Sequence, residues 1–246
     1  MIKIQQLQKA YRRGGETLRV LDGLDLDIAS GEFCALMGPS GSGKSTLLNI
    51  IGGLDRADGG GIVVADEDLT LLSEDELAAW RAKTVGFVFQ GFNLIPVLTA
   101  LENVELPLLL SPLSRKARRE HARYALELVG LTDRSGHRPA QLSGGQEQRV
   151  AVARAFVTDP TLILADEPTG DLDRTSADQV LELLERLHRE LNKTILIVTH
   201  DPRAAERAGR IVQLDKGRLA VSQAGEGSPE KGSIEKGAPH EGRSGS

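Results

Sequence analysis

The sequence predicts an α/β fold built around a parallel β-sheet, and two observations lead to this prediction. Four short aliphatic runs without polar alternation are typical of strands buried on both faces: Phe33–Met37, Val85–Phe89, Thr161–Ala165 and Thr194–Thr199. Segments with helical periodicity follow or separate them: Leu47 onward, Ser114–Val129, Gln146–Val157 and Ala177–Leu191. Such alternation indicates a parallel sheet with helices on its faces.

Three other segments differ from this alternating pattern. Short strand-like pieces at Ile2–Leu7, Arg19–Ile28 and Gly61–Val64, joined by Gly-rich or Asp-rich turns, predict a small antiparallel sheet near the N-terminus. Residues 92–145 lack strand signals and are rich in Leu, Ala and Arg, so we expect a helical subdomain there. We therefore expect one domain over residues 1–221, followed by a disordered tail at 222–246, which is rich in Gly and Ser and has little apolar surface to bury.

The composition argues against several classes of protein. The 246 residues carry a net charge of −5, which argues against a surface devoted to nucleic acid, so no nucleic-acid partner is expected. Cys34 is the single cysteine and cannot form an intramolecular disulfide, which favours a cytoplasmic location. No stretch approaches the roughly 18 consecutive apolar residues of a membrane span, so attachment to a membrane would need another protein.

A phosphate-binding loop follows the first predicted core strand. Residues 38–45 match the pattern G-x-x-x-x-G-K-S and precede a helix-compatible segment, which is the strand–loop–helix context that this motif requires. We expect Lys44 to reach the β- and γ-phosphates of a nucleotide and Ser45 to ligate Mg²⁺. The predicted nucleotide-binding residues here are Gly38, Pro39, Ser40, Gly41, Ser42, Gly43, Lys44, Ser45 and Thr46.

Two acidic residues end a later apolar run. They add information about the reaction, because a phosphate-binding loop alone is compatible with a kinase, a GTPase or an ATPase. Asp166 and Glu167 follow Leu162–Ala165 at the expected carboxyl end of a buried strand. Asp166 is suited to hold Mg²⁺ through water. Glu167 is then free to act as general base or to position the attacking water.

The most specific string is Leu142–Gln146, with the sequence LSGGQ. It resembles the signature motif of ATP-binding cassette (ABC) proteins. Ser143 can cap the helix that follows, and Gly144 and Gly145 expose backbone amides at its positive end, so this is a second phosphate-binding surface. The resemblance implies the ABC ATPase fold, a P-loop NTPase with a RecA-like parallel core, an antiparallel β subdomain and a helical subdomain. It also implies a head-to-tail homodimer in which Ser143, Gly144, Gly145 and Gln146 contact the ATP held by the partner's P-loop.

The same resemblance implies roles for four further residues. Tyr11 lies where the family stacks an aromatic ring on adenine. Gln90 matches the Q-loop glutamine, which senses Mg²⁺ and the γ-phosphate. Asp173 corresponds to the D-loop residue that shapes the facing subunit's site. His200 matches the H-loop histidine that contacts the γ-phosphate and keeps the water and Glu167 in register.

Residues 85–108 and the run from Glu167 to Asp173 resemble the LolD/MacB-type branch, which comprises lipoprotein-releasing and macrolide-exporting ATPases. This resemblance implies an ATP-hydrolysing subunit attached to the inner face of the cell membrane through an integral-membrane permease, where selectivity would lie. Asp171 departs from the asparagine usual there. The alternatives are a soluble cassette without a transport role and a cell-division ATPase with a related permease. A small-molecule kinase or GTPase is disfavoured because it has no use for the signature motif.

Overall fold

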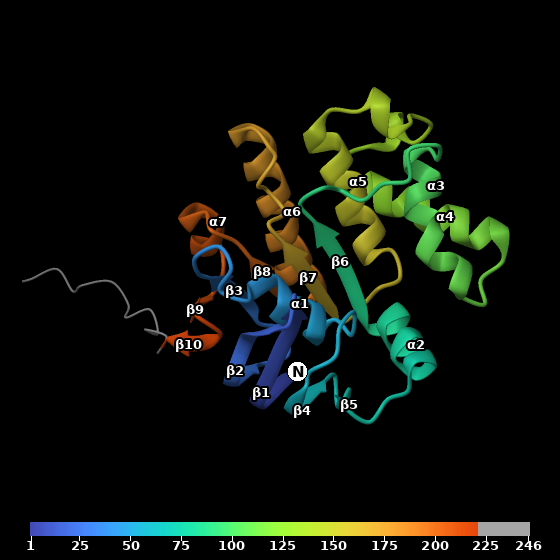
Figure 1. The fold of residues 1–246 in the computed structure, drawn as a ribbon. Helices are drawn as coiled ribbons and strands as arrows, with labels where there is room; N and C mark the ends of the chain where they lie inside the picture. Colours follow the sequence, from blue (N-terminus) through green and yellow to red (C-terminus); the bar gives the residue numbers. More distant parts are fainter. Residues whose placement is uncertain (221–246) are drawn as a thin grey trace, which may run out of the picture.

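Two β-sheets and a group of helices make up residues 1–220, the part of the chain that the computed structural model describes (Figure 1). The predicted tail at 222–246 lies outside the described residues.

The larger sheet has six strands in the order β10-β9-β3-β8-β7-β6. Five of them are parallel and β10 pairs antiparallel with β9 at one edge. The four predicted core strands are present within one residue of their expected bounds, whereas β9 and β10 were not predicted. The strands are β3 (Phe33–Met37), β6 (Val85–Phe89), β7 (Leu162–Asp166), β8 (Thr194–Val198), β9 (Arg210–Asp215) and β10 (Arg218–Ala220).

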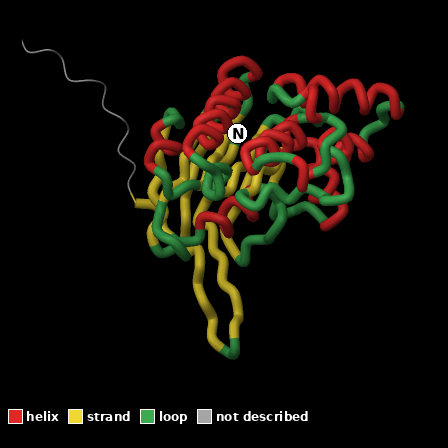
Figure 2. The backbone as a smooth tube through the Cα atoms, turned by 90° about the horizontal axis from the view of Figure 1, so that it is seen from above, coloured by secondary structure: helices red, strands yellow, loops and turns green. Residues whose placement is uncertain are grey.

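The smaller sheet is antiparallel and has the order β2-β1-β4-β5. Its strands are β1 (Ile2–Arg13), β2 (Glu16–Ile28), β4 (Gly59–Val64) and β5 (Glu67–Asp68). The first two are longer than predicted, because the backbone ladder continues past the apolar residues to pairs such as Tyr11 with Leu18. Pairing between main-chain groups needs no buried side chain, so this extension, the long hairpin in Figure 2, has no apolar signal.

The helices are α1 (Lys44–Ile51), α2 (Glu74–Thr84), α3 (Ala100–Glu105), α4 (Arg115–Leu128), α5 (Gly144–Phe156), α6 (Arg174–Leu191) and α7 (Pro202–Glu206). Between α3 and α5 lie three short 3₁₀ segments at Leu106–Leu110, Thr132–Arg134 and Pro139–Gln141. Helix α2 was not predicted, although Ser73 and Glu76 form a capping box at its start that is visible in the sequence. Helices α3, α4 and the first part of α5 gather on one side of the molecule, beyond the edge strand β6 (Figure 1).

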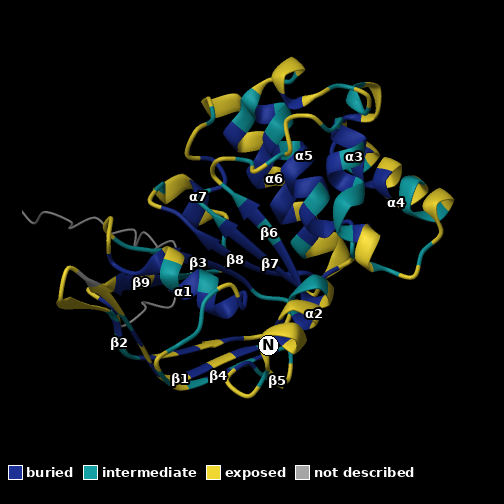
Figure 3. Cartoon of the chain, turned by 45° about the vertical axis from the view of Figure 1, so that its right-hand side comes forward, coloured by how far each residue is buried: buried dark blue, intermediate teal, exposed yellow. Residues whose placement is uncertain are grey.

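The core has two apolar clusters, one on each face of the large sheet. Successive residues of β3 alternate between them: Phe33 and Ala35 pack with α5 and α6, whereas Cys34 and Leu36 pack with α1 and the small sheet. The central strands are buried throughout, while the helices are exposed on their outer faces (Figure 3). This two-sided burial explains the absence of polar alternation in these strands.

Candidate functional site

The candidate site lies at the carboxyl edge of the parallel sheet, where ligands bind in open α/β folds. The strands β6, β7 and β8 are in register, with Phe89 opposite Asp166 and Asp166 opposite Val198. The residues that follow these strands and β3 are therefore brought to one edge although they are far apart in the sequence. They include Gly38, Gln90, Glu167 and His200.

The phosphate-binding loop depends on glycine at two positions in particular. Gly43 has φ +103°, and a side chain there would approach the Val20 carbonyl oxygen to 2.9 Å. A Cβ on Gly38 would overlap the carbonyl oxygen of Leu214. The loop is thus pressed against β2 and β9, and only glycine fits these two backbone positions.

A cavity of about 690 Å³ opens over this loop. Its lining comprises Leu18, Val20, Gly38, Pro39, Ser40, Gly41, Gly43, Lys44, Ser45, Thr46, Glu167 and His200. Of the predicted loop residues, only Ser42 is absent from this lining, and it is buried. Lys44 donates hydrogen bonds from Nζ to the carbonyl oxygens of Gly38 (2.8 Å) and Pro39 (3.0 Å), which keeps its ammonium group over the loop.

Ser45 and Asp166 lie together although 121 positions separate them, with Ser45 Oγ donating to Asp166 Oδ1 at 3.2 Å. Burial raises the pKa of Asp166 and the neighbouring Glu167 adds to the increase, while the Ser45 hydrogen bond and the Lys44 charge oppose it. Burial makes the charged form of a carboxyl group unfavourable, and a nearby cation stabilises that charged form. Hydroxyl and carboxylate oxygens are also the donors that Mg²⁺ prefers, so this pair fits the predicted metal. Among residues 1–220, no cluster of three or more His, Cys, Asp and Glu side chains is arranged to hold a metal ion.

Glu167 and His200 form a polar side-chain pair in the cavity wall. His200 Nδ1 is 2.9 Å from both Glu167 Oε1 and Oε2, and the His200 backbone N–H points at Oε2 from 3.4 Å. Glu167 has φ +47°, an uncommon value for a residue with a side chain, and its backbone N–H donates to Val198 O at 2.9 Å. Such strain is typical of functional positions, and here the strained residue carries the carboxylate that contacts His200.

Gln90 follows β6 and lies against the loop after β7. Its Nε2 donates to Asp171 Oδ1 at 2.9 Å. A Cβ added to Gly170 would come within 2.9 Å of the same nitrogen, so the glycine permits this close packing. The predicted role of Gln90 toward Mg²⁺ stays a prediction, but its side chain is held by Gly170 and Asp171, in the loop that follows Glu167.

Tyr11 lies on the β1–β2 hairpin, outside the cavity lining. Its hydroxyl donates to Asp55 Oδ2 at 2.5 Å, and Lys9 Nζ lies 4.9 Å from the ring centroid. Burial raises the pKa of the phenol, and the bond to Asp55 adds to the increase. The ring is 40% exposed. Its stacking on adenine stays a prediction.

The signature residues lie at the start of α5 and none of them lines the cavity over the P-loop. Ser143 Oγ accepts from Gln146 N at 3.3 Å, and Gln146 Oε1 accepts from Ser143 N at 3.0 Å, which is a complete capping box. A side chain on Gly145 would overlap Ser176 Oγ, so α5 packs tightly on α6 here. Within one chain, the P-loop cavity and the signature are thus separate surfaces.

Asp173 caps α6 by accepting hydrogen bonds from Ser176 N (3.0 Å) and Ser176 Oγ (2.7 Å). The hydrogen bond from the Ser176 hydroxyl lowers the pKa of Asp173 most, and hydrogen bonds from backbone N–H groups lower it further. This local role leaves its predicted contact with a facing subunit untested.

Two cavity residues, Leu18 and Val20, were not predicted as site residues. They come from β2, and nothing in their local sequence distinguishes them from other strand residues. They reach the site only because the small sheet is packed beside the P-loop, as the proximity of Val20 to Gly43 illustrates.

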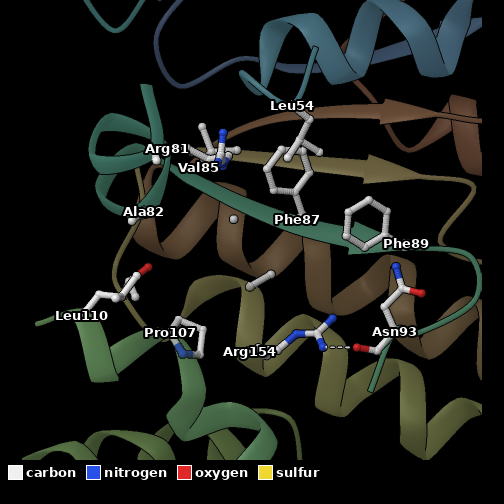
Figure 4. A pocket seen from close by; sticks show the side chains of 14 residues that line it. Leu54, Arg81, Ala82, Val85, Phe87, Phe89, Asn93, Pro107, Leu110 and Arg154 are labelled. Carbon is white, nitrogen blue, oxygen red and sulfur yellow. Dashed lines mark hydrogen bonds between the residues drawn. The ribbon is translucent and has the colours of Figure 1, made fainter. Parts of the chain in front are cut away.

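A second hollow, of about 530 Å³, lies between β6 and the helices beyond it (Figure 4). Its wall includes Leu54, Val85, Phe87, Phe89, Pro107 and Leu110, and Arg154 reaches across toward Asn93. These residues come from four separate segments, and no local pattern in the sequence marks them as a set. No helix within residues 1–220 has the length and apolarity needed to cross a bilayer.

Comparisons with known proteins agree with this arrangement. The sequence model of the family described as ABC transporter matches residues 21–170. A macrolide export ATP-binding/permease protein MacB of Paracoccus denitrificans is 52% identical over 91% of this chain and 33% of its own length. The lipoprotein-releasing system ATP-binding protein LolD of Pseudoalteromonas translucida is 45% identical over 91% of this chain and 96% of its own.

Among solved structures, the dimeric ATP-binding cassette MJ0796, in a post-hydrolysis state with ADP and Pi, superposes with a TM-score of 0.86. It is 44% identical, and the alignment covers 93% of this chain and 100% of that one. The chain thus spans about a third of the MacB relatives (33% and 34% in two of them) and nearly all of LolD.

Proposed function

The chain belongs to the ABC transporter family, and on that premise we propose that it is an ATP-hydrolysing nucleotide-binding subunit that drives a membrane permease of the MacB or LolD type. The observation that carries this proposal is the Glu167–His200 pair in the wall of the P-loop cavity, with the signature loop outside it. A cavity with phosphate donors and a placed carboxylate is suited to hydrolysis at the γ-phosphate. A signature surface outside the cavity is suited to complete a second chain's site.

Binding of ATP is assigned to the P-loop and its lysine. The backbone N–H groups of the loop and of the first turn of α1 would cradle the phosphates, and Lys44 would exchange its bonds to the loop carbonyls for phosphate oxygens. Ser45, Asp166 and Gln90 would hold Mg²⁺, and the ion would neutralise part of the phosphate charge. Leu18 and Val20 would contact the apolar part of the nucleotide.

Glu167 is assigned as the base that orients and deprotonates the attacking water, since its carboxylate lies in the cavity wall. His200, at 2.9 Å from both carboxylate oxygens, would hold this group in one orientation and face the γ-phosphate. The strained backbone at Glu167 and its bond to β8 make the position rigid before substrate arrives, which lowers the reorganisation needed in the transition state.

A head-to-tail homodimer would bring each signature over the partner's P-loop, so that two ATP molecules lie at the interface. The dimeric state of MJ0796 with bound ADP and Pi supports this assembly. Because each site then needs both chains, ATP stabilises the dimer and hydrolysis releases it.

The apolar hollow beside β6 is assigned as the docking site of a cytoplasmic segment of the permease. It adjoins the Gln90 loop through Phe89 and Asn93, so a docked helix would sense a movement there. Apolar walls with a few polar groups are typical of such helix-binding grooves. This contact would hold the chain at the cytoplasmic face of the membrane.

The substitution Glu167→Gln tests the catalytic assignment. We expect ATP binding to persist, hydrolysis to fall by about 100-fold to 10,000-fold, and a nucleotide-bound dimer to accumulate on size exclusion. Normal hydrolysis by this variant would show that another group is the base.

A mixture of two inactive variants tests the shared site. In a heterodimer of Ser143→Arg and Lys44→Ala chains, one composite site retains both an intact P-loop and an intact signature. Partial recovery of hydrolysis on mixing is the expected result.

Recovery of a membrane permease with the tagged protein from detergent-solubilised membranes would support the transport role, and a soluble ATPase without such a partner would favour a cassette outside transport.

A further inference from the structure

Helix α5 carries a fully buried glutamine that contacts the end of β6 and the loop that follows β7. Gln148 is 0% exposed, and its Nε2 donates to the carbonyl oxygens of Pro168 (2.6 Å) and Phe89 (3.2 Å). Pro168 directly follows Glu167, and Phe89 directly precedes Gln90. One side-chain amide thus spans the backbone next to both proposed active-site residues.

Burial of this amide is unfavourable in free energy, and an apolar side chain at the same position would avoid the penalty. Gln148 Oε1 is buried and accepts no hydrogen bond from any residue in the described part of the chain. An unpaired buried oxygen is unfavourable, and such a group in a native structure calls for an explanation. The two donated bonds are the compensating feature, since without them both carbonyl groups would lose a donor.

A second side chain of α5 holds the other end of the Gln90 segment. The Arg154 guanidinium donates to the carbonyl oxygen of Phe92 at 2.9 Å and to that of Asn93. Phe92 and Asn93 have φ values of +56° and +51°, a conformation that side-chain-bearing residues adopt only when the surroundings support it. Residues 89–93 are therefore attached to α5 on both sides of Gln90.

The signature motif lies at the N-terminus of this same helix, and its Ser143 is five positions before Gln148. Close-packed elements transmit displacement, and α5 is packed closely on α6 at Gly145 and Ser176. A displacement of Ser143 would reach the loop carbonyls through Gln148 and Arg154 without an intervening flexible segment.

We propose, on the basis of the function proposed above, that Gln148 is a positioning residue that links the signature helix to Gln90 and Glu167 of the same chain. In the dimer, the signature contacts the ATP of one composite site, whereas Gln90 and Glu167 act in the other. Engagement of the signature in one site thereby sets the catalytic side chains of the second, and the two sites hydrolyse ATP cooperatively.

The substitution Gln148→Met tests this link, because methionine has a similar length and volume and donates no hydrogen bond. We expect kcat for ATP to fall by about 10-fold to 100-fold, as for a small misplacement of catalytic groups, with the Kd for ATP changed by less than about 2-fold. We expect a Hill coefficient for ATP above 1 in the unaltered chain and a value closer to 1 in the variant. Gln179→Met, an exposed glutamine on α6, is the matched control and should match the unaltered chain.

Two results would overturn the link: an unchanged kcat, or a lower kcat with an unchanged Hill coefficient, which would indicate a purely local role. If the unaltered chain hydrolyses no ATP, the proposed function itself fails, and this outcome is recognised before any variant is compared.

A double-mutant cycle separates positioning from a general loss of structure. Because Gln148 acts through Glu167, adding Gln148→Met to Glu167→Gln should lower the residual rate by much less than the same change in the unaltered chain. Full additivity would contradict the link. If Gln148→Met does not fold, Gln148→Glu replaces it, because a protonated carboxyl group can donate one of the two hydrogen bonds. The Hill coefficient of this variant should then rise as the pH is lowered. A pH-independent value equal to that of the unaltered chain would overturn the link.

Discussion

Helices α1 and α5 both begin at glycine-rich loops, but their first backbone N–H groups have different partners. Gly43 caps α1 with no side-chain hydrogen bond, so the donors of the first turn remain available to a ligand. Ser143 caps α5 with a complete capping box, which uses part of the same donor set. The first helix start lines a cavity, and the second lies outside it.

The difference supports the proposal that each chain contributes its P-loop to one composite site and its signature to the other. The P-loop leads into a helix start without a side-chain cap, carries the buried Lys44, and is walled by β2 and by residues that follow the core strands. The signature is prearranged by its own cap and by contact with α6, so it needs an opposing surface rather than a rearrangement. Nucleotide affinity should therefore depend on the first loop, and turnover on both.

The largest effect is expected from Lys44→Ala. Removal of the ammonium group should weaken ATP binding by about 100-fold or more, because a charge-assisted contact to phosphate is lost in a partly buried site. Isothermal titration with ATP measures this change, with Lys216→Ala, an exposed lysine, as control. An affinity within about 2-fold of the unaltered chain would contradict the comparison.

Ser143→Arg should separate binding from turnover. We expect hydrolysis to fall by about 100-fold, because the arginine blocks approach of the partner's ATP, while the Kd for ATP changes by less than about 2-fold. Steady-state hydrolysis and titration together provide the measurement. Ser114→Arg makes the same change at the N-cap of α4 and should leave hydrolysis unchanged; weakened ATP binding by Ser143→Arg would mean that the two loops are not independent.

A pair of glycine substitutions should test how rigidly the signature is held. Gly145→Ala should reduce the free energy of unfolding by about 1–3 kcal/mol, because its methyl group would overlap Ser176. Gly144→Ala is the matched control, since its methyl group would meet Leu172 and Phe92 at 3.6 Å, an ordinary contact distance. Urea denaturation compares the two, and equal stabilities would show that α5 can shift freely against α6.

The smallest effect concerns the strand that leads into the P-loop. Burial raises the pKa of the Cys34 thiol to about 11 from 9.0. Above pH 9 the unfolded chain loses this proton and the folded chain keeps it, so stability should decline between pH 9 and about 11. This decline should be shallower in Cys34→Ala. Chemical denaturation of the two proteins at several pH values measures the difference, and parallel curves would mean that the thiol ionises without unfolding.

Most of the local architecture could be predicted from the sequence. The core strands have unbroken apolar runs because both faces are buried, and Ser143 and Gln146 have the spacing of a capping box. The extended hairpin and α2 were missed, since the hairpin is exposed and α2 buries only a few of its residues, among them Leu77 and Trp80. Apolar periodicity is the main signal in a single sequence, and it is weak where little is buried.

The P-loop, the acid pair and the signature can be recognised in the sequence because each depends on residues within a few positions of one another. Only the folded chain shows that Leu18 and Val20 wall the cavity and that the signature lies outside it. The same holds for Gln148, which joins the end of β6 to the loop after β7, at residues 59 and 20 positions away. Such contacts arise when parallel strands bring distant residues to one edge, and no local pattern encodes which side chains will meet there.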